Sequence, residues 1–385
     1  MELSQADREV INRFNEHASE VTDSTLTANL EPWFANIREL VRANFHLQDI
    51  AELGSHALKL AKYFVILGSG PSAPKILRDL PLSRDIALIC GPTAVSSCLV
   101  ANRTPDLVFV ADSKPEQYTV IRDLEPEDPS LWRIALPITA DPQWYAEDSI
   151  FKRSQLYFYC NYLNHEGSVD FAYNHIMKIL CPDVIHYLSQ AGCVGNAALT
   201  FADMICGKDI SKRIYLGLDC CGWLTDPPKL RAPDALKKSD GSYAPVTTFR
   251  QVKQNEEDSE NALRLSLPFM DIQTNLTSLG YAIQMLYLAY AHSVGDRARR
   301  YVLLEESSAL YSCANKNDGL EVIVPSIKAS EIGLSVEPFA EDDWAYKLLV
   351  KLSRMLVVHQ EHIASLAKEV VDASEEDISS EHSEG

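Results

Sequence analysis

The sequence predicts an α/β protein with a doubly wound, mostly parallel, Rossmann-like sheet and added N- and C-terminal helices. Three observations predict this fold. Short apolar runs recur from Tyr63 onward, and several are unbroken, as in strands that are buried on both faces. Stretches suited to crossover helices separate these runs. Polar or glycine-bearing turns follow several runs, at the positions where open α/β sheets bind their ligands.

The predicted elements alternate along the chain. Strands are expected at Tyr63 to Leu67, Ile86 to Cys90, Leu107 to Ala111, Ile134 to Ile138, Leu156 to Cys160, Val184 to Leu188 and Ile214 to Leu218, with one more run from Tyr301. Helices are expected at Thr93 to Asn102, Glu116 to Leu124 and Asn196 to Cys206. This alternation is typical of βαβ units, which favour a parallel sheet.

The chain divides into four predicted parts. Residues 1–60 form a helical N-terminal segment, residues 61–330 the α/β domain, residues 331–371 an amphipathic helical segment and residues 372–385 an acidic disordered tail. The amphipathic segment either packs on the body or pairs with a second subunit, which would make a homo-oligomer. Within the domain, the Pro-rich segment Gly222 to Pro245 has the composition of a lid or binding loop, and we expect it to contact an acceptor.

Composition excludes several classes of protein. The formal net charge of -19, with six acidic groups in the last fourteen residues, disfavours nucleic-acid binding. The polar N-terminus and the lack of a long apolar run predict neither a signal peptide nor a membrane span, so a cytoplasmic location is expected. The nine cysteines contain no C-x-x-C pair, and we expect most of them to be buried, reduced thiols rather than zinc ligands.

Four strand ends gather polar residues suited to a phosphate-containing ligand. The first turn is Gly68, Ser69, Gly70, Pro71 and Ser72, and a later one is Gly192, Cys193, Val194, Gly195 and Asn196. Glycines allow close approach of the backbone, and the following helices would direct free N–H groups at an anion. Neither turn is a Walker loop or a complete G-x-G-x-x-G motif. A tight turn with a capping serine is the structural alternative for the first turn, and two such turns are harder to explain structurally than one.

Two carboxylates at strand ends are the candidate catalytic residues. Asp112 follows the third strand and Asp219 follows the seventh. Asp112 suits a ribose hydroxyl, a metal or an acceptor hydroxyl, with capping of the next helix as the alternative. For Asp219 the alternative is a solvated residue in a turn. His165 and His186 have no recognisable partner in the sequence. Packing is their expected role, and a general base is the alternative for each. Together the four turns predict a nucleotide-containing small molecule as ligand, and no metal site is assigned.

The same blocks resemble a known family. ILGSGPS (Ile66 to Ser72), PDLVFVAD (Pro105 to Asp112), AGCVGNAAL (Ala191 to Leu199), RIYLGLD (Arg213 to Asp219), and LEESSALYS with GLEVIVPSI between Leu303 and Ile327 are similar to the family named for the archaeal 6-hydroxymethylpterin diphosphokinase. That superfamily also looks related to the Maf flagellin glycosyltransferases and to bacterial sialyltransferases with a GxGPS loop. The resemblance covers roughly residues 60 to 330 and implies a Rossmann-like transferase.

Within the resemblance, the glycosyltransferase relatives are the better match. The diphosphokinase branch has acidic clusters that suit Mg²⁺, whereas VADSK and CVGNAA stand at those places here. The neutral turn Gly192 to Asn196 is similar in type to the sialyltransferase turn, which holds a cytidine monophosphate sugar without metal. The histidine base of those enzymes has no match, since no histidine lies between Asp219 and His292, and Asp226 or Tyr243 would have to replace it.

The resemblance therefore implies a nucleotide-dependent transferase, foremost a glycosyltransferase with a CMP- or UDP-linked sugar as donor substrate. Two alternatives stay open. One is a Mg²⁺-dependent diphosphokinase that acts on a pterin-like hydroxymethyl group with ATP, and Mg²⁺ is expected only in that case. The other is a non-catalytic nucleotide-binding or assembly protein that docks through its C-terminal helix.

Overall fold

The computed structural model describes most of the α/β domain. The described residues are 28–53, 58, 61, 63–81, 85–162, 178–184, 186–189, 193–206, 212–225, 229, 231–232, 234–246, 262–266, 271–275, 278, 281 and 300–302. The predicted C-terminal helical segment 331–371, the tail 372–385 and the blocks LEESSALYS and GLEVIVPSI lie outside these residues. Among the described residues, no helix has the length and apolarity needed to cross a lipid bilayer.

A nine-stranded sheet forms the centre of the described structure, and every strand pair in it is parallel. Its strands are β1 (Gln48–Asp49), β2 (Tyr63–Leu67), β3 (Ile86–Cys90), β4 (Leu107–Phe109), β5 (Ile134–Pro137), β6 (Leu156–Tyr162), β7 (Tyr187–Ser189), β8 (Lys212–Leu216) and β14 (Arg300–Val302). Their order is β1-β6-β5-β4-β3-β2-β8-β14, and β7 also pairs with β6. The predicted α/β class and the parallel sheet are confirmed.

The strand order reverses at β2. From β2 the chain adds β3, β4, β5 and β6 in sequence on one side, and it then returns to place β8 on the opposite side of β2. This reversal defines a doubly wound sheet, and it makes the carboxyl ends of β2 and β8 the switch point where such sheets bind ligands.

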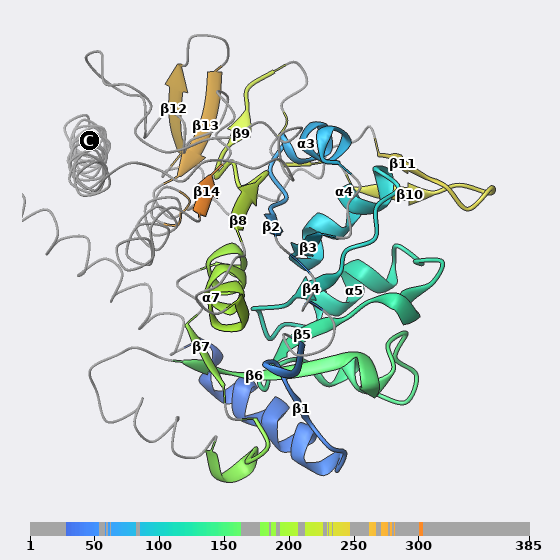
Figure 1. Ribbon diagram of the computed structural model, residues 1–385, viewed down its shortest axis with the longest axis vertical. Helices are drawn as coiled ribbons and strands as arrows, with labels where there is room; N and C mark the ends of the chain where they lie inside the picture. The colour runs from blue at the N-terminus through green and yellow to red at the C-terminus, as the bar shows by residue number, and fades with distance from the viewer. Residues whose placement is uncertain are drawn as a thin grey trace, which may run out of the picture.

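Helices cover both faces of the sheet, as Figure 1 shows for α7 on one side and for α4 and α5 on the other. The described helices are α3 (Ala73–Asp79), α4 (Val95–Val100), α5 (Glu116–Arg122), α7 (Val194–Cys206) and the helical residues 28–42, with single turns η1 (Pro92–Ala94), η2 (Pro129–Leu131), η3 (Pro142–Trp144) and η4 (Arg153–Gln155). The predicted helices at 93–102, 116–124 and 196–206 correspond to η1 with α4, to α5 and to α7.

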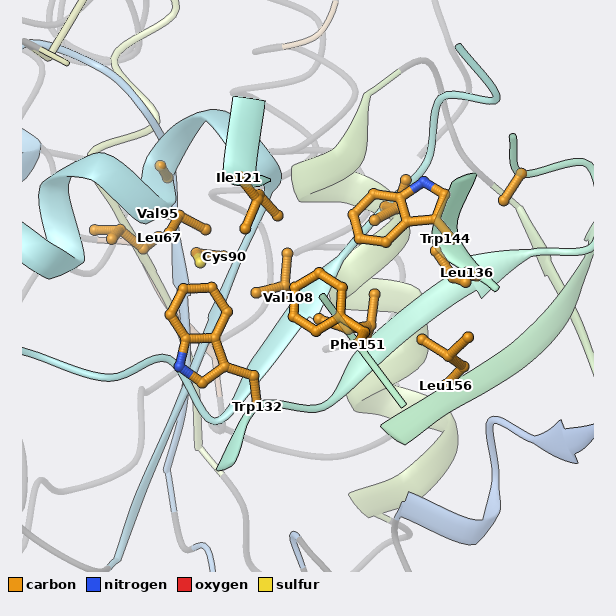
Figure 2. Close-up of a cluster of buried hydrophobic side chains, with 14 of the residues drawn as sticks. Leu67, Cys90, Val95, Val108, Ile121, Trp132, Leu136, Trp144, Phe151 and Leu156 are labelled. Atoms are coloured by element: carbon orange, nitrogen blue, oxygen red, sulfur yellow. The ribbon is translucent and has the colours of Figure 1, made fainter. Parts of the chain in front are cut away.

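Burial on both faces explains the unbroken apolar runs. All five residues of β2 and all five of β3 are buried. Tyr63, Val65 and Leu67 belong to the main core cluster, which also contains residues of α3, α4, α5 and the helix 28–42. Figure 2 shows Leu67, Cys90 and Val108 of neighbouring strands in this cluster. On the opposite face, Phe109 packs against Phe201 of α7 with ring centroids 5.8 Å apart.

Several strands were not expected from the sequence. The segment Gly222 to Pro245 contains β9 (Gly222–Trp223) and a hairpin of β10 (Ala235–Lys237) and β11 (Tyr243–Pro245), while β12 (Ala262–Ser266) and β13 (Asp271–Asn275) pair with β9 in a small antiparallel sheet. Gly241 closes the hairpin turn with a φ of +83°, which favours glycine. These strands are short, and those of the segment Gly222 to Pro245 are not buried throughout, so no unbroken apolar run predicts them.

Cys90, Cys98, Cys160 and Cys181 are buried, free thiols. This confirms the expectation for these four side chains. Burial raises the pKa of Cys160 to about 12 and that of Cys181 to about 11, so at neutral pH both are protonated.

We expect Cys160 and Cys181 to resist alkylation by iodoacetamide at pH 8 in the folded protein, because the thiolate is the reacting form. Peptide mapping by mass spectrometry before and after unfolding in urea measures the difference, and the half-buried Cys220 and Cys221 serve as internal comparators. Rapid labelling of Cys160 in the folded chain would contradict this prediction.

Candidate functional site

Two turns pack tightly against each other at the switch point. The amide of Gly68 donates to the carbonyl of Leu216 at 2.7 Å, and the amide of Gly70 donates to that of Gly217 at 2.8 Å. A Cβ atom at Gly68 or Gly70 would overlap the carbonyl oxygen of Gly217. The glycines of the first turn are therefore required by its contact with the turn after β8, a requirement that the sequence alone did not indicate.

A buried carboxylate completes this contact. Asp219 Oδ2 accepts from the Ser72 amide at 2.8 Å, and its Oδ1 accepts from Ser72 Oγ at 2.6 Å. Ser72 is fully buried and Asp219 is 3% exposed. The carboxylate thus takes the place that an anionic ligand would occupy at the start of α3, and its negative charge opposes a phosphate there. Of the predicted first-turn residues, Ser69 and Gly70 remain partly exposed.

The N-terminus of α7 joins the same edge of the sheet. A Cβ atom at Gly91, directly after β3, would lie 3.0 Å from Val194 Cγ1, and one at Gly195 would lie 3.0 Å from Leu218 Cδ2. The first turn of α7 therefore lies against the ends of β3 and β8. Asn196 is fully buried in this turn. Gly192 lies outside the described residues.

Cys193 precedes α7, and the amides of Gly195 and Asn196 hydrogen-bond to its sulfur. Burial raises the pKa of the Cys193 thiol, and these two amides partly oppose that rise. The thiol is therefore protonated near neutral pH and adds no charge to the helix N-terminus.

Asp112 lies at the same edge but farther from the switch point. It follows β4, which β3 separates from β2. Its side chain is exposed, and Oδ1 accepts from the Lys114 amide at 3.1 Å. The structure thus brings together the turns after β2 and β8 and the start of α7, while Asp112 lies two strands away.

A polar network next to Asp112 was not predicted from the sequence. Ser113 Oγ lies 2.6 Å from Thr139 Oγ1, and Asn161 Nδ2 donates to Thr139 Oγ1 at 3.1 Å. All three side chains are buried, at the ends of β4, β5 and β6. Thr139 and Asn161 directly follow the predicted strands 134–138 and 156–160. They are polar residues at strand ends, as Asp112 is, so the same sequence signal marks them.

His186 has a partner that the sequence did not reveal. Its Nδ1 lies 2.6 Å from Asp49 Oδ1, and its amide donates to Asp49 Oδ2 at 3.1 Å. Asp49 belongs to β1 and His186 precedes β7, and both strands pair with the same edge of β6. The expectation that this histidine only packs is wrong: the pair joins two short strands end to end. His165 lies outside the described residues.

The Pro-rich segment crosses the first turn and then leaves the edge. The amide of Ala232 donates to the carbonyl of Ser69 at 2.9 Å. Farther along, β10 and β11 contact α4, and Lys237 Nζ and Tyr243 Oη both donate to the Glu125 carbonyl at 2.8 Å. Burial raises the pKa of Tyr243, so its hydroxyl is unsuited to act as a base. Asp226 lies outside the described residues.

One cavity of about 480 Å³ lies beside the end of α5, where Arg122, Ile150 and Lys237 contribute to its lining. It is separate from the switch point. Within the described ranges, no group of three or more His, Cys, Asp or Glu side chains is arranged to hold a metal ion.

Comparison with known proteins does not identify a family for this chain. No protein-family model matches the chain, so the resemblance to the diphosphokinase family stays a prediction, and no curated protein matches either. Among solved structures, the chain is similar to a MAf glycosyltransferase from Magnetospirillum magneticum AMB-1, with a TM-score of 0.41 and 13% sequence identity over 80% of this chain. The similarity spans 42% of that protein, and at this TM-score it supports no functional conclusion.

We expect Gly70→Ala to lower the free energy of unfolding by roughly 1–3 kcal/mol, because the added methyl group overlaps Gly217 and the Asp219 carboxylate. Urea denaturation monitored by circular dichroism measures the change. The neighbouring Ser69→Ala, at a partly exposed side chain, is the control and should change stability by less than about 0.5 kcal/mol. Equal stability of both variants would contradict the packing described.

Asp219→Ala should destabilise the fold by about 1–3 kcal/mol, since the buried Ser72 amide loses its acceptor. Asp219→Asn keeps an acceptor oxygen and should lose less. The same denaturation experiment tests both variants, with exposed Asp148→Ala as the matched control. An Asp219→Ala protein as stable as the Asp148→Ala protein would show that the carboxylate does not support the fold.

Proposed function

We propose that this protein is a nucleotide-dependent transferase, and that it transfers a glycosyl group from a nucleotide-activated sugar. One observation carries the proposal: three polar turns, after β2, after β8 and at the start of α7, meet where the strand order reverses. Ligands of open α/β sheets bind in the crevice at this point. We further propose a CMP- or UDP-linked sugar as the donor, because the turn at the start of α7 is neutral and poor in carboxylates.

The charge of Asp219 favours one orientation of the donor. The Asp219 carboxylate accepts the hydrogen bond of the Ser72 amide at the start of α3, and its charge would repel a phosphate there. We therefore propose that the phosphate groups of the donor lie toward α7. The 13-residue α7 directs its N-terminal dipole at that position, which favours a negative group. The nucleoside or sugar would then lie over the partly exposed Ser69 and Gly70.

The proposed roles of the two candidate carboxylates differ. Asp219 is a positioning residue, since both of its oxygens bind Ser72 and hold the two turns together. Asp112 is exposed at the same edge, and among the described residues it accepts one hydrogen bond, at Oδ1 from the Lys114 amide of its own turn. It therefore has an oxygen to accept the proton of an attacking hydroxyl, which is the role of a general base in glycosyl transfer.

A thermal-shift experiment on the full chain tests the proposal with CMP, CTP, UDP, GDP and ATP, each with and without Mg²⁺. A ligand that binds only the folded state at about 100 times its Kd adds about 2.7 kcal/mol of stability and raises Tm. We expect CMP or UDP to raise Tm without Mg²⁺. Ser69→Ala should reduce this shift, whereas Ser239→Ala, at an exposed hairpin position far along the chain, should not.

Other responses would separate the alternatives. Stabilisation by ATP that strictly requires Mg²⁺ would favour a diphosphokinase. A lack of response to every nucleotide would overturn the proposal and leave an assembly protein. A nucleotide shift that persists unchanged in Ser69→Ala would show that the ligand binds away from the switch point.

A further inference from the structure

The polar network at the ends of β4, β5 and β6 contains hydrogen-bonding groups that its own members do not satisfy. Asn161 is 1% exposed, and its Oδ1 has no hydrogen-bond donor among the residues that the structure describes. A buried acceptor without a partner costs free energy, so such groups are rare unless a water or ligand binds them.

The network also contains one hydroxyl proton that has no acceptor among the described residues. Thr139 Oγ1 accepts from Asn161 Nδ2 and shares a single hydrogen bond with Ser113 Oγ. Two hydroxyls that share one bond use one of their two protons, so the second proton has no acceptor in the described part of the chain. The network therefore offers both a donor and an acceptor.

The frame that carries these side chains is fixed. Asn36 Nδ2 donates to the carbonyl of Thr139 at 2.9 Å and to that of Ser113 at 3.3 Å, and Tyr145 Oη donates to the carbonyl of Asn36 at 3.3 Å. Tyr159 Oη donates to the carbonyl of Val110 at 2.7 Å, which fixes the end of β4. Side chains held on a rigid frame of this kind are typical of binding sites.

We propose that Ser113, Thr139 and Asn161 form a subsite for a hydroxyl group of a neutral, polyhydroxylated substrate, and that this substrate is the sugar or acceptor of the proposed transfer. A hydroxyl both donates and accepts, so it satisfies the network in either orientation of the Asn161 amide. The three side chains are uncharged, which matches a neutral partner rather than an ion. Exposed Asp112 adjoins Ser113 and is positioned to accept from a neighbouring hydroxyl.

The position of the subsite agrees with the proposed function, on which this inference rests. Neighbouring strands lie about 4.8 Å apart, so β4 lies roughly 10 Å from β2 along the same carboxyl edge. A nucleotide-linked sugar or its acceptor spans that length. The donor nucleotide at the switch point and the hydroxyl-bearing group at β4 to β6 would then occupy one continuous edge.

Saturation-transfer difference NMR on the full chain tests the subsite with glucose, galactose and N-acetylglucosamine, each with and without CMP or UDP. Tetrahydropyran, a ring of similar size without hydroxyl groups, is the negative probe. We expect saturation transfer to at least one sugar and none to tetrahydropyran. Thr139→Val should weaken sugar binding about tenfold, because one hydrogen bond to the hydroxyl network is lost.

Thr119→Val is the matched control, since Thr119 Oγ1 donates to the carbonyl of Pro115, the N-cap residue of its own helix, at an exposed position. Ser113→Ala, which removes a hydroxyl nearer the surface, is the second variant if Thr139→Val does not fold, as judged by circular dichroism. Sugar binding that is equal in wild type, Thr139→Val and Ser113→Ala would overturn the subsite. So would the absence of any sugar signal from folded wild-type protein, which would leave water as the partner of the network.

The change in Tm that nucleotides cause in the same samples separates the sugar subsite from the proposed transferase function. Loss of sugar binding with an intact nucleotide shift in Thr139→Val supports both. A nucleotide shift with no sugar signal overturns the subsite alone. Sugar binding that depends on Thr139 in a chain that binds no nucleotide overturns the transferase and retains the subsite.

Discussion

The hydrogen bonds between Asp219 and Ser72 hold together the turns that follow β2 and β8, the two paired strands at which the halves of the sheet meet. Ser72 lies between β2 and α3, in the half that runs from β2 to β6, and Asp219 follows β8 on the other side. A buried carboxylate is costly unless it is hydrogen-bonded, and here two donors from one residue satisfy it. Gly68, Gly70 and Gly217 are glycines because the turns that carry these groups approach so closely.

This constraint also shapes the candidate site. Because the Asp219 carboxylate closes the start of α3, we place the phosphate groups of the proposed donor toward the N-terminus of α7. Farther along the edge, neutral hydroxyl and amide groups replace charges at the ends of β4 to β6. This change from a buried carboxylate to uncharged groups along the edge agrees with the donor and the acceptor that we propose.

The remaining polar pairs stabilise the periphery. Asp49 and His186 join β1 to β7 along one edge of β6, and Asn36 ties the N-terminal helix to the ends of β4 and β5. The β10–β11 hairpin is attached through Glu125. Each pair connects residues far apart in the sequence, so each fixes how the outer segments lie on the sheet rather than whether they form.

The sequence by itself determined the strands that are buried on both faces. β2 and β3 have the predicted bounds because an apolar run buried on two sides is unbroken, and the α/β class follows from its alternation with helices. It also marked the polar strand ends, including Asp112 and Asp219. Only the tertiary structure decided the strand order, the short antiparallel strands β9 to β13 and the meeting of residues 72 and 219, which are 147 positions apart. Contacts of that kind leave no local periodicity, because the partner that satisfies each group is supplied by a distant part of the chain.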